Sequence, residues 1–120
     1  MAATILIVDD NQLLLQALCE HLERQGYDTV LANNGREAVT AIKQERPDLV
    51  IMDLIMPVMG GVEAARLLRA DPQYRDLPVI AFTSQSNIGQ WDDLFNDYLL
   101  KPFDYDNLIK IITKFIPRKE

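Results

Sequence analysis

The stretch Thr4-Ile5-Leu6-Ile7-Val8-Asp9-Asp10 decides the fold, because it is a short, mainly apolar run that ends in two carboxylates. The same pattern returns in three later stretches: Leu49-Val50-Ile51-Met52-Asp53, Val79-Ile80-Ala81-Phe82-Thr83 and Tyr98-Leu99-Leu100-Lys101-Pro102. Short apolar runs bounded by polar loop residues are typical of buried strands in a parallel sheet. We therefore expect several parallel strands, each of which ends in a chemically useful side chain.

The ends of these strands predict one common site. In open α/β sheets, ligands bind outside the carboxyl ends of the strands. Three carboxylates, a hydroxyl and an ammonium group are therefore expected at one edge of the sheet, from Asp9, Asp10, Asp53, Thr83 and Lys101. This combination predicts a site for phosphoryl transfer.

Helical segments alternate with the strands. We expect helices over residues 12–25, 36–45, 61–70 and 105–115, and a weaker helical pattern over 87–95. Gly26, Pro47 and Pro72 are typical of positions where a helix has ended, and Asp104 is a suitable N-cap for the last helix. With a further short strand expected over residues 29–32, a strand and a helix alternate five times, which favours a doubly wound α/β domain with helices on both faces of a five-stranded parallel sheet.

Size and composition restrict the possible classes of protein. The 120 residues suffice for one domain, expected over residues 1–120, and 48% of them are hydrophobic. The apolar runs reach about five residues, far short of the ~20 that span a bilayer, and no signal peptide is visible. A single cysteine, Cys19, suits a reducing cytoplasm. A net charge of −6 without a basic cluster argues against direct binding of nucleic acid or membrane.

Taken in order, these residues resemble the receiver domain of two-component response regulators, over the whole chain. The aspartate pair, the lone aspartate, the threonine and the Lys-Pro dipeptide all match that family, as does the loop Asp53-Leu54-Ile55-Met56-Pro57-Val58-Met59-Gly60-Gly61. The resemblance implies a flavodoxin-like fold with the sheet order 2-1-3-4-5.

The resemblance also implies a role for each residue of the site. Asp53 is the nucleophile that becomes an acyl phosphate. Mg²⁺ is held by Asp10, Asp53 and the carbonyl of Ile55, while Asp9 acts largely through water. Lys101 balances charge on the phosphoryl oxygens. Three further residues have conformational roles: Thr83 and Tyr98 as switch residues, and Pro102, expected after a cis bond, as the residue that fixes the turn.

The implied function is that of a phosphoacceptor, which modifies itself at Asp53 and does not turn over an external substrate. The phosphodonor would be a histidine kinase or a histidine phosphotransfer protein that docks on the first helix. On that helix we expect Leu14, Leu18 and Leu22 to face the core, which leaves Leu13, Leu15 and Cys19 toward solvent. The chain is either a stand-alone regulator or the receiver of a hybrid kinase, and its downstream target cannot be read.

Two other classes of protein remain as alternatives. A haloacid-dehalogenase-like phosphatase also uses an aspartate nucleophile and Mg²⁺, but it has a second aspartate two residues later, where this chain has Ile55. A flavodoxin would bind flavin through a hydroxyl- and glycine-rich loop after the first strand, where this chain has Asp9-Asp10-Asn11-Gln12.

Two departures from the family pattern have structural consequences. Thr83 and Lys101 are 18 residues apart (101 − 83), about one helical turn fewer than the family pattern. We therefore expect a shortened fourth helix of roughly two turns over residues 90–95, anchored by Leu94, Phe95 and Ile88, with Trp91 partly exposed. The apolar Ile55 replaces the polar residue of members that lose their phosphoryl group quickly, which predicts a slow loss here.

Overall fold

Five parallel strands form the centre of the fold. The computed structural model describes residues 2–84 and 89–116, in which the strands pair in the order β2-β1-β3-β4-β5. Their bounds are Thr4–Val8 (β1), Asp28–Ala32 (β2), Leu49–Asp53 (β3), Val79–Thr83 (β4) and Asp97–Leu100 (β5). Every pair is parallel, so all the carboxyl ends meet at one edge. The expected doubly wound, flavodoxin-like sheet is confirmed.

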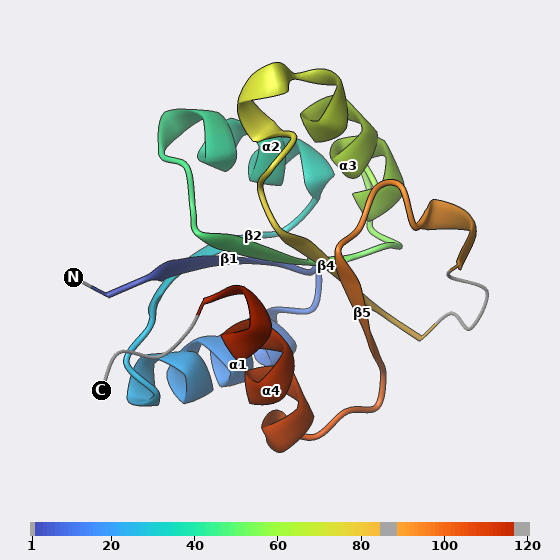
Figure 1. Cartoon of the computed structure of the whole chain (residues 1–120). Helices are drawn as coiled ribbons and strands as arrows, with labels where there is room; N and C mark the ends of the chain where they lie inside the picture. The colour runs from blue at the N-terminus through green and yellow to red at the C-terminus, as the bar shows by residue number, and fades with distance from the viewer. Residues whose placement is uncertain (1, 85–88, 117–120) are drawn as a thin grey trace.

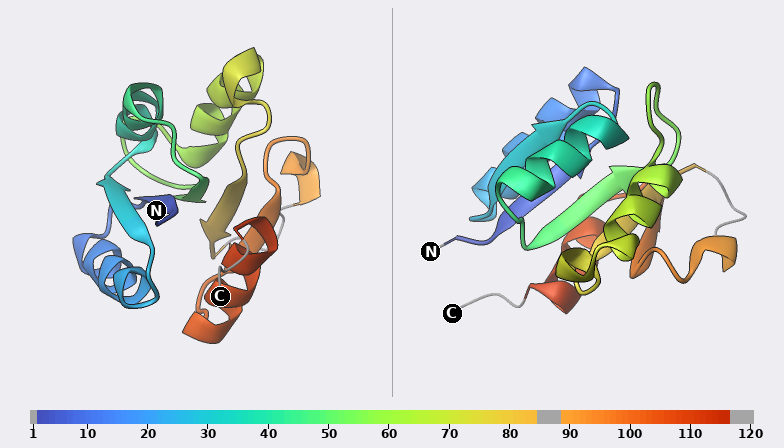
Figure 2. Two further views of the ribbon diagram at one scale, coloured as in Figure 1. Left: turned by 60° about the vertical axis from the view of Figure 1, so that its left-hand side comes forward. Right: turned by 90° about the horizontal axis from the view of Figure 1, so that it is seen from above.

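Two helices cover each face of this sheet (Figure 1). Helices α2 (Gly35–Gln44) and α3 (Gly61–Ala70) lie on one face, and α1 (Gln12–Arg24) and α4 (Tyr105–Phe115) lie on the other. The turned view in Figure 2 shows the same two pairs on opposite sides of the strands. Each face therefore has its own apolar core. None of the helices in the described residues combines the length and the apolar character that crossing a membrane requires.

Side-chain caps start three of these helices directly beyond the strand ends. Asn11 caps α1 by accepting a hydrogen bond from the backbone of Leu14 at 3.2 Å, and Asn34 caps α2 in the same way. Asp104 caps α4 through the backbone of Asn107 at 2.7 Å, as expected. These caps satisfy backbone N–H groups that have no partner within the helix. The starts of α1, α2 and α4 are consequently fixed by side chains of the preceding loops.

The buried stripe of α1 differs from the expected one. Leu15, Leu18 and Leu22 are buried, whereas Leu14 is only partly buried and Leu13 is 80% exposed. The prediction that Leu15 faces solvent was therefore wrong. A strict spacing of four drifts around a helix that has 3.6 residues per turn, so steps of three and four keep the stripe on the sheet.

Among its described residues, the connection between β4 and β5 contains a single turn of 3-10 helix, η2 (Gly89–Trp91), where the fourth helix was expected. The prediction of a shortened helix is confirmed, although two turns over residues 90–95 overestimated its length. Leu94 and Phe95 are buried and Trp91 is partly exposed, both as expected. The third proposed anchor, Ile88, lies outside the described residues.

The side chain of Arg69, near the end of α3, holds the end of this connection in place. Its Nε donates to the carbonyl of Leu94 at 3.0 Å, and its Nη2 donates to Oδ1 of Asn96 at 2.8 Å. Its Nη1 donates to three carbonyls between α3 and β4, those of Tyr74, Arg75 and Leu77. The same Asn96 oxygen accepts from Val79 at the start of β4. One guanidinium thus joins α3, the segment before β4 and the last residues of the connection between β4 and β5.

We predict that Arg69→Met lowers the free energy of unfolding by roughly 2–4 kcal/mol, because several carbonyls, most of them partly buried, lose a charged donor at once. Urea denaturation measures this loss. Arg66→Met is the matched control, since Arg66 lies one turn earlier on α3 and is exposed. Equal stability of the two variants would show that the Arg69 contacts contribute nothing measurable.

Candidate functional site

Asp9 and Asp53 lie side by side at the carboxyl edge of the sheet. β1 and β3 pair with Val8 beside Met52, so the next residue of each strand is an aspartate. Side chains alternate along a strand, and the residues two places earlier in each strand pack in the core beneath α1 and α4. Both carboxylates therefore belong to that face. They are also buried, with exposed fractions of 1% for Asp9 and 8% for Asp53.

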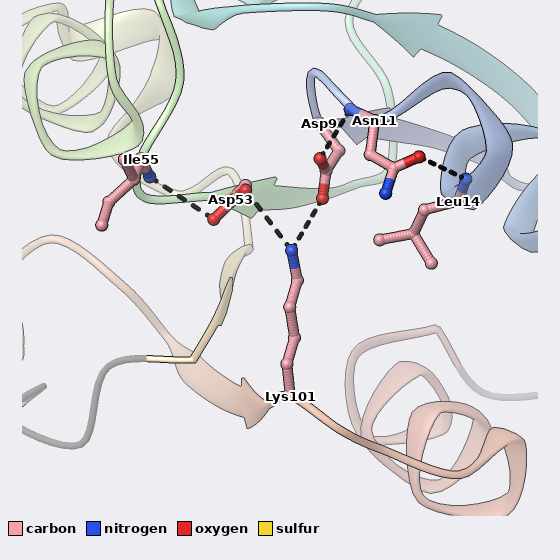
Figure 3. Close-up of polar contacts among 6 residues, drawn as sticks. All are labelled: Asp9, Asn11, Leu14, Asp53, Ile55 and Lys101. Carbon is pink, nitrogen blue, oxygen red and sulfur yellow. Dashed lines mark hydrogen bonds and ion pairs between the residues drawn. The ribbon is translucent and has the colours of Figure 1, made fainter.

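Lys101 places its ammonium between these two carboxylates. Its Nζ lies 3.0 Å from Oδ2 of Asp9 and 3.4 Å from Oδ2 of Asp53. Figure 3 shows the side chain extending from the end of β5 toward both aspartates. Two buried like charges next to each other repel, and an ammonium at these distances reduces that repulsion. The fold thus brings together the three charged groups that the sequence assigned to β1, β3 and the end of β5.

The carboxylates also accept hydrogen bonds from their own loops. Oδ1 of Asp9 accepts from the backbone of Asn11 at 2.9 Å, and Oδ1 of Asp53 accepts a long bond from the backbone of Ile55 at 3.4 Å. Burial raises the pKa of Asp53 above 3.8, the charge of Lys101 opposes this rise, and the charge of Asp9 adds to it. The ionised form of Asp53 is therefore held in an environment that disfavours it.

The backbone of Lys101 is held by the neighbouring strand. Its N–H donates to the carbonyl of Thr83 at 2.8 Å, which extends the pairing of β4 with β5 by one residue. The following bond, to Pro102, is cis, as expected. The ammonium also lies over the ring of Phe82, 4.5 Å from its centroid. Lys101 is thus positioned by its own strand end, by two carboxylates and by an aromatic ring.

Asp10 completes an acidic cluster that is suited to a metal ion. Asp9, Asp10 and Asp53 can each offer one carboxylate oxygen, and these oxygens lie within 4.8 Å of one another. Asp10 is exposed, and within the described residues no hydrogen bond to its carboxylate is found. Hard oxygen donors of this kind suit Mg²⁺. The side chain of Ile55 is exposed, and its backbone N–H donates to Asp53. The carbonyl of Ile55 therefore lies in the loop that directly follows Asp53.

The two residues expected to act as a switch lie on neighbouring strands. Thr83 is buried at the end of β4, one residue beyond the partner of Asp53 on that strand. Tyr98 is half-buried on β5, and its hydroxyl donates to Oδ1 of Asp92. Burial and this contact with Asp92 raise the pKa of Tyr98. Tyr98 is therefore neutral and bonded to the connection between β4 and β5.

The loop after Asp53 depends on a glycine. A Cβ atom at Gly61 would lie 2.2 Å from the carbonyl oxygen of Asp53, so a larger residue would push α3 away from the end of β3. The backbone of Gly61 donates to the carbonyl of Leu54 at 3.0 Å and closes the loop. Val58, at the tip, has a φ of 68°, a conformation that strains a β-branched residue. The loop that holds Asp53 and Ile55 is therefore tightly constrained.

The sequence did not predict two contacts, that of Lys101 with Phe82 and that of Tyr98 with Asp92. Phe82 was interpreted only as the last apolar residue of a strand, and Asp92 was not assigned a role. Phe82 lies on the face of Asp53 because the two are register partners, and alternation within one strand does not reveal that register. No local pattern indicates that Asp92 meets Tyr98, because the path of the connection depends on the Arg69 contacts.

The chain matches the family model described as "Response regulator receiver domain" over residues 5–113. It is similar to Protein PilH of Pseudomonas aeruginosa, with 37% identity over 92% of this chain and 95% of that protein. It is 36% identical to the CAI-1 autoinducer sensor kinase/phosphatase CqsS of Vibrio cholerae, but spans only 17% of it. It spans 53% of the DNA-binding response regulator MtrA of Mycolicibacterium smegmatis, at 33% identity.

Solved structures agree with these relatives. The signal receiver domain of a histidine kinase from Syntrophus aciditrophicus superposes with a TM-score of 0.89 at 34% identity, covering 99% of this chain and 96% of that one. The receiver domain of the sensor histidine kinase PA1611 from Pseudomonas aeruginosa has a TM-score of 0.88 at 32% identity, over 98% and 100%. That domain has a magnesium ion coordinated in its active-site cleft. Neither the phosphatase nor the flavodoxin alternative receives support from the comparisons.

We predict that Asp53→Asn raises the melting temperature of the metal-free protein at neutral pH by roughly 2–5 °C. Because the pKa of Asp53 is raised on folding, the folded chain binds more protons than the unfolded chain just above pH 3.8. The free energy of unfolding therefore falls as the pH rises through the raised pKa of Asp53. The asparagine of the variant does not ionise and avoids this loss.

Thermal melts in a chelator across this pH range provide the measurement, and the advantage of the variant should shrink as the pH approaches 3.8. The exposed Asp28 provides a control, since Asp28→Asn should leave the melting temperature unchanged. A lower melting temperature for Asp53→Asn would show that Asp53 is stabilising in the metal-free protein.

Proposed function

The chain belongs to the response regulator receiver family, and from this premise we propose that Asp53 accepts a phosphoryl group from a histidine kinase or a histidine phosphotransfer protein. The observation that supports this role is the ammonium of Lys101 held between the buried carboxylates of Asp9 and Asp53. The chain spans only part of the length of several relatives, so the identity of its phosphodonor is also proposed here. We propose that residues 1–120 act as one receiver domain in the cytoplasm.

In the proposed reaction, a carboxylate oxygen of Asp53 attacks the phosphorus atom of the donor. A phosphorus–oxygen bond forms to Asp53, and the bond from phosphorus to the donor's imidazole nitrogen breaks. The electron pair of that bond leaves with the imidazole. Lys101 is already at the carboxylate, where it can meet the phosphoryl oxygens without a large movement. The protein modifies itself once and does not turn over an external substrate.

The acidic cluster fits a resident Mg²⁺ ion. We propose that Asp10, Asp53 and the carbonyl of Ile55 hold it directly, and that Asp9 acts through water. This division is supported by the existing partners of Asp9, whose oxygens accept from Asn11 and Lys101. When bound, Mg²⁺ supplies positive charge that offsets the repulsion between the phosphoryl group and the carboxylates.

Thr83 and Tyr98 are proposed to report the phosphorylated state. Thr83 would donate its hydroxyl to a phosphoryl oxygen, which pulls the end of β4 toward Asp53. The carbonyl of Thr83 is bonded to the backbone of Lys101, so both residues respond together. Tyr98 is bonded to Asp92 in the present structure and would exchange that partner for a more buried position.

The phosphodonor is proposed to dock at the beginning of α1, beside the site. Leu13 is exposed there, whereas the buried Leu15 contributes to the core and cannot contact a partner. An exposed leucine near a reactive group fits a surface that a helical partner covers.

We predict that incubation with acetyl phosphate and Mg²⁺ adds one phosphoryl group to the protein, at Asp53. Acyl phosphates are labile to base and hydroxylamine and stable in acid, so intact mass before and after hydroxylamine identifies the linkage. Asp53→Asn should remain unmodified. Persistent modification of that variant would assign the nucleophile to another residue.

We predict that Asp10→Asn weakens Mg²⁺ binding more than Asp9→Asn does, because Asp10 has no competing partner among the described residues whereas Asp9 is bonded to Lys101. Titration calorimetry of the two variants gives both affinities. Equal losses would contradict the proposed division between direct and water-mediated ligands.

We predict that Ile55→Asn shortens the lifetime of the acyl phosphate several-fold. The exposed, apolar Ile55 cannot orient a water molecule for in-line attack, whereas an amide can. The decay of phosphorylated protein, followed by intact mass, measures the rate. Ile55→Val is the control, since it keeps the side chain apolar. Equal decay in all three proteins would exclude control of water by this side chain.

A further inference from the structure

Phe82 lies directly between the origin of Lys101 and its targets. Phe82 is the register partner of Asp53 on β4 and of Leu99 on β5, and Lys101 follows Leu99 by two residues on the same face. Neighbouring strands are about 4.8 Å apart, so the backbones of β5 and β3 are roughly 10 Å apart, and the side chains of Lys101 and Asp53 meet between them. The side chain of Lys101 therefore passes over the end of β4, and the surface beneath it is Phe82.

The ring of Phe82 is well placed to attract the ammonium. Nζ of Lys101 lies 4.5 Å from the ring centroid, within the range of a cation–π contact. The ring is 1% exposed, and Phe103 packs against it at 83° with centroids 4.8 Å apart. A buried and laterally supported ring cannot easily turn away. The ammonium thus has a third partner in addition to its two carboxylates.

The contact with the ring matters because the carboxylates of Asp9 and Asp53 interact with both the ammonium of Lys101 and a bound metal ion. Asp9 and Asp53 would share their negative charge with a bound Mg²⁺, so their attraction for Lys101 weakens in the loaded protein. The quadrupole of an aromatic ring is not neutralised by that ion. The ring can therefore retain the ammonium when the carboxylates hold it least.

We propose that Phe82 is a positioning residue, whose ring holds the ammonium of Lys101 over the site while the carboxylates are occupied by Mg²⁺, ready for the phosphoryl oxygens. The proposal rests on the function proposed above for Asp53. In this role the ring of Phe82 acts through Lys101 alone and requires no direct contact with the phosphoryl group.

The test is the affinity of the Mg²⁺-loaded protein for beryllofluoride, a mimic of the phosphoryl group, followed by amide chemical shifts. Phe82 is replaced by phenylalanines with increasing fluorination, which nearly preserve the shape of the ring and progressively remove its negative face. We expect a graded loss that reaches about three- to tenfold, the scale of a partly desolvated cation–π contact. Phe82→Met should show a similar loss, while the affinity for Mg²⁺ alone does not fall.

Tyr74→Met is the matched control. Tyr74 is also a buried aromatic residue with a cation over its ring, Arg46 at 6.0 Å, but it precedes β4 at the opposite edge of the sheet. Its substitution should leave the beryllofluoride affinity unchanged. Affinity independent of fluorination at Phe82, or an equal loss of Mg²⁺ affinity, would overturn the positioning role. A wild-type protein that binds no beryllofluoride would overturn the proposed function of Asp53 as well.

Discussion

The rest of the site depends on one interaction, the contact of the Lys101 ammonium with the buried carboxylates of Asp9 and Asp53. Two carboxylates with little exposure would repel each other strongly if no cation lay beside them. The parallel sheet delivers them to one edge, and the last strand delivers the charge that makes their proximity tolerable. That balance also bears on the pKa of Asp53, which burial and the charge of Asp9 raise and the charge of Lys101 lowers.

Different contacts hold the site and the connection between β4 and β5 in place. The reactive groups are fixed by strand register and by the loops that follow β1 and β3, which do not require a helix between β4 and β5. That connection instead relies on Arg69, whose guanidinium bonds to Leu94 and Asn96. The chain can therefore keep the phosphoacceptor arrangement of its family although the described part of this connection contains only one turn of 3-10 helix. Tyr98 is the link between the two parts, since it lies on β5 and bonds to Asp92.

Much of the fold could be predicted because local patterns and global topology agree. The strand ends at Asp9, Asp53 and Thr83 were visible as polar residues after apolar runs, and a parallel sheet must bring such ends together. The burial of Leu15 was missed because a spacing of four was followed too strictly along α1. The contacts of Arg69 could not be foreseen, since they join carbonyls of two segments whose path depends on the packed structure. The position of Phe82 beneath Lys101 required the register of three strands, which no single segment specifies.

The balance between Lys101 and the carboxylates is tested most directly by the affinity for Mg²⁺ of the wild-type protein and of Lys101→Met. The ammonium bonds to Asp9 and Asp53, both members of the acidic cluster, and therefore competes with a metal ion for the same negative charge. Titration calorimetry of the two proteins at neutral pH should show tighter binding of Mg²⁺ by Lys101→Met. Unchanged or weaker binding by that variant would contradict the central role of this ammonium in neutralising the site.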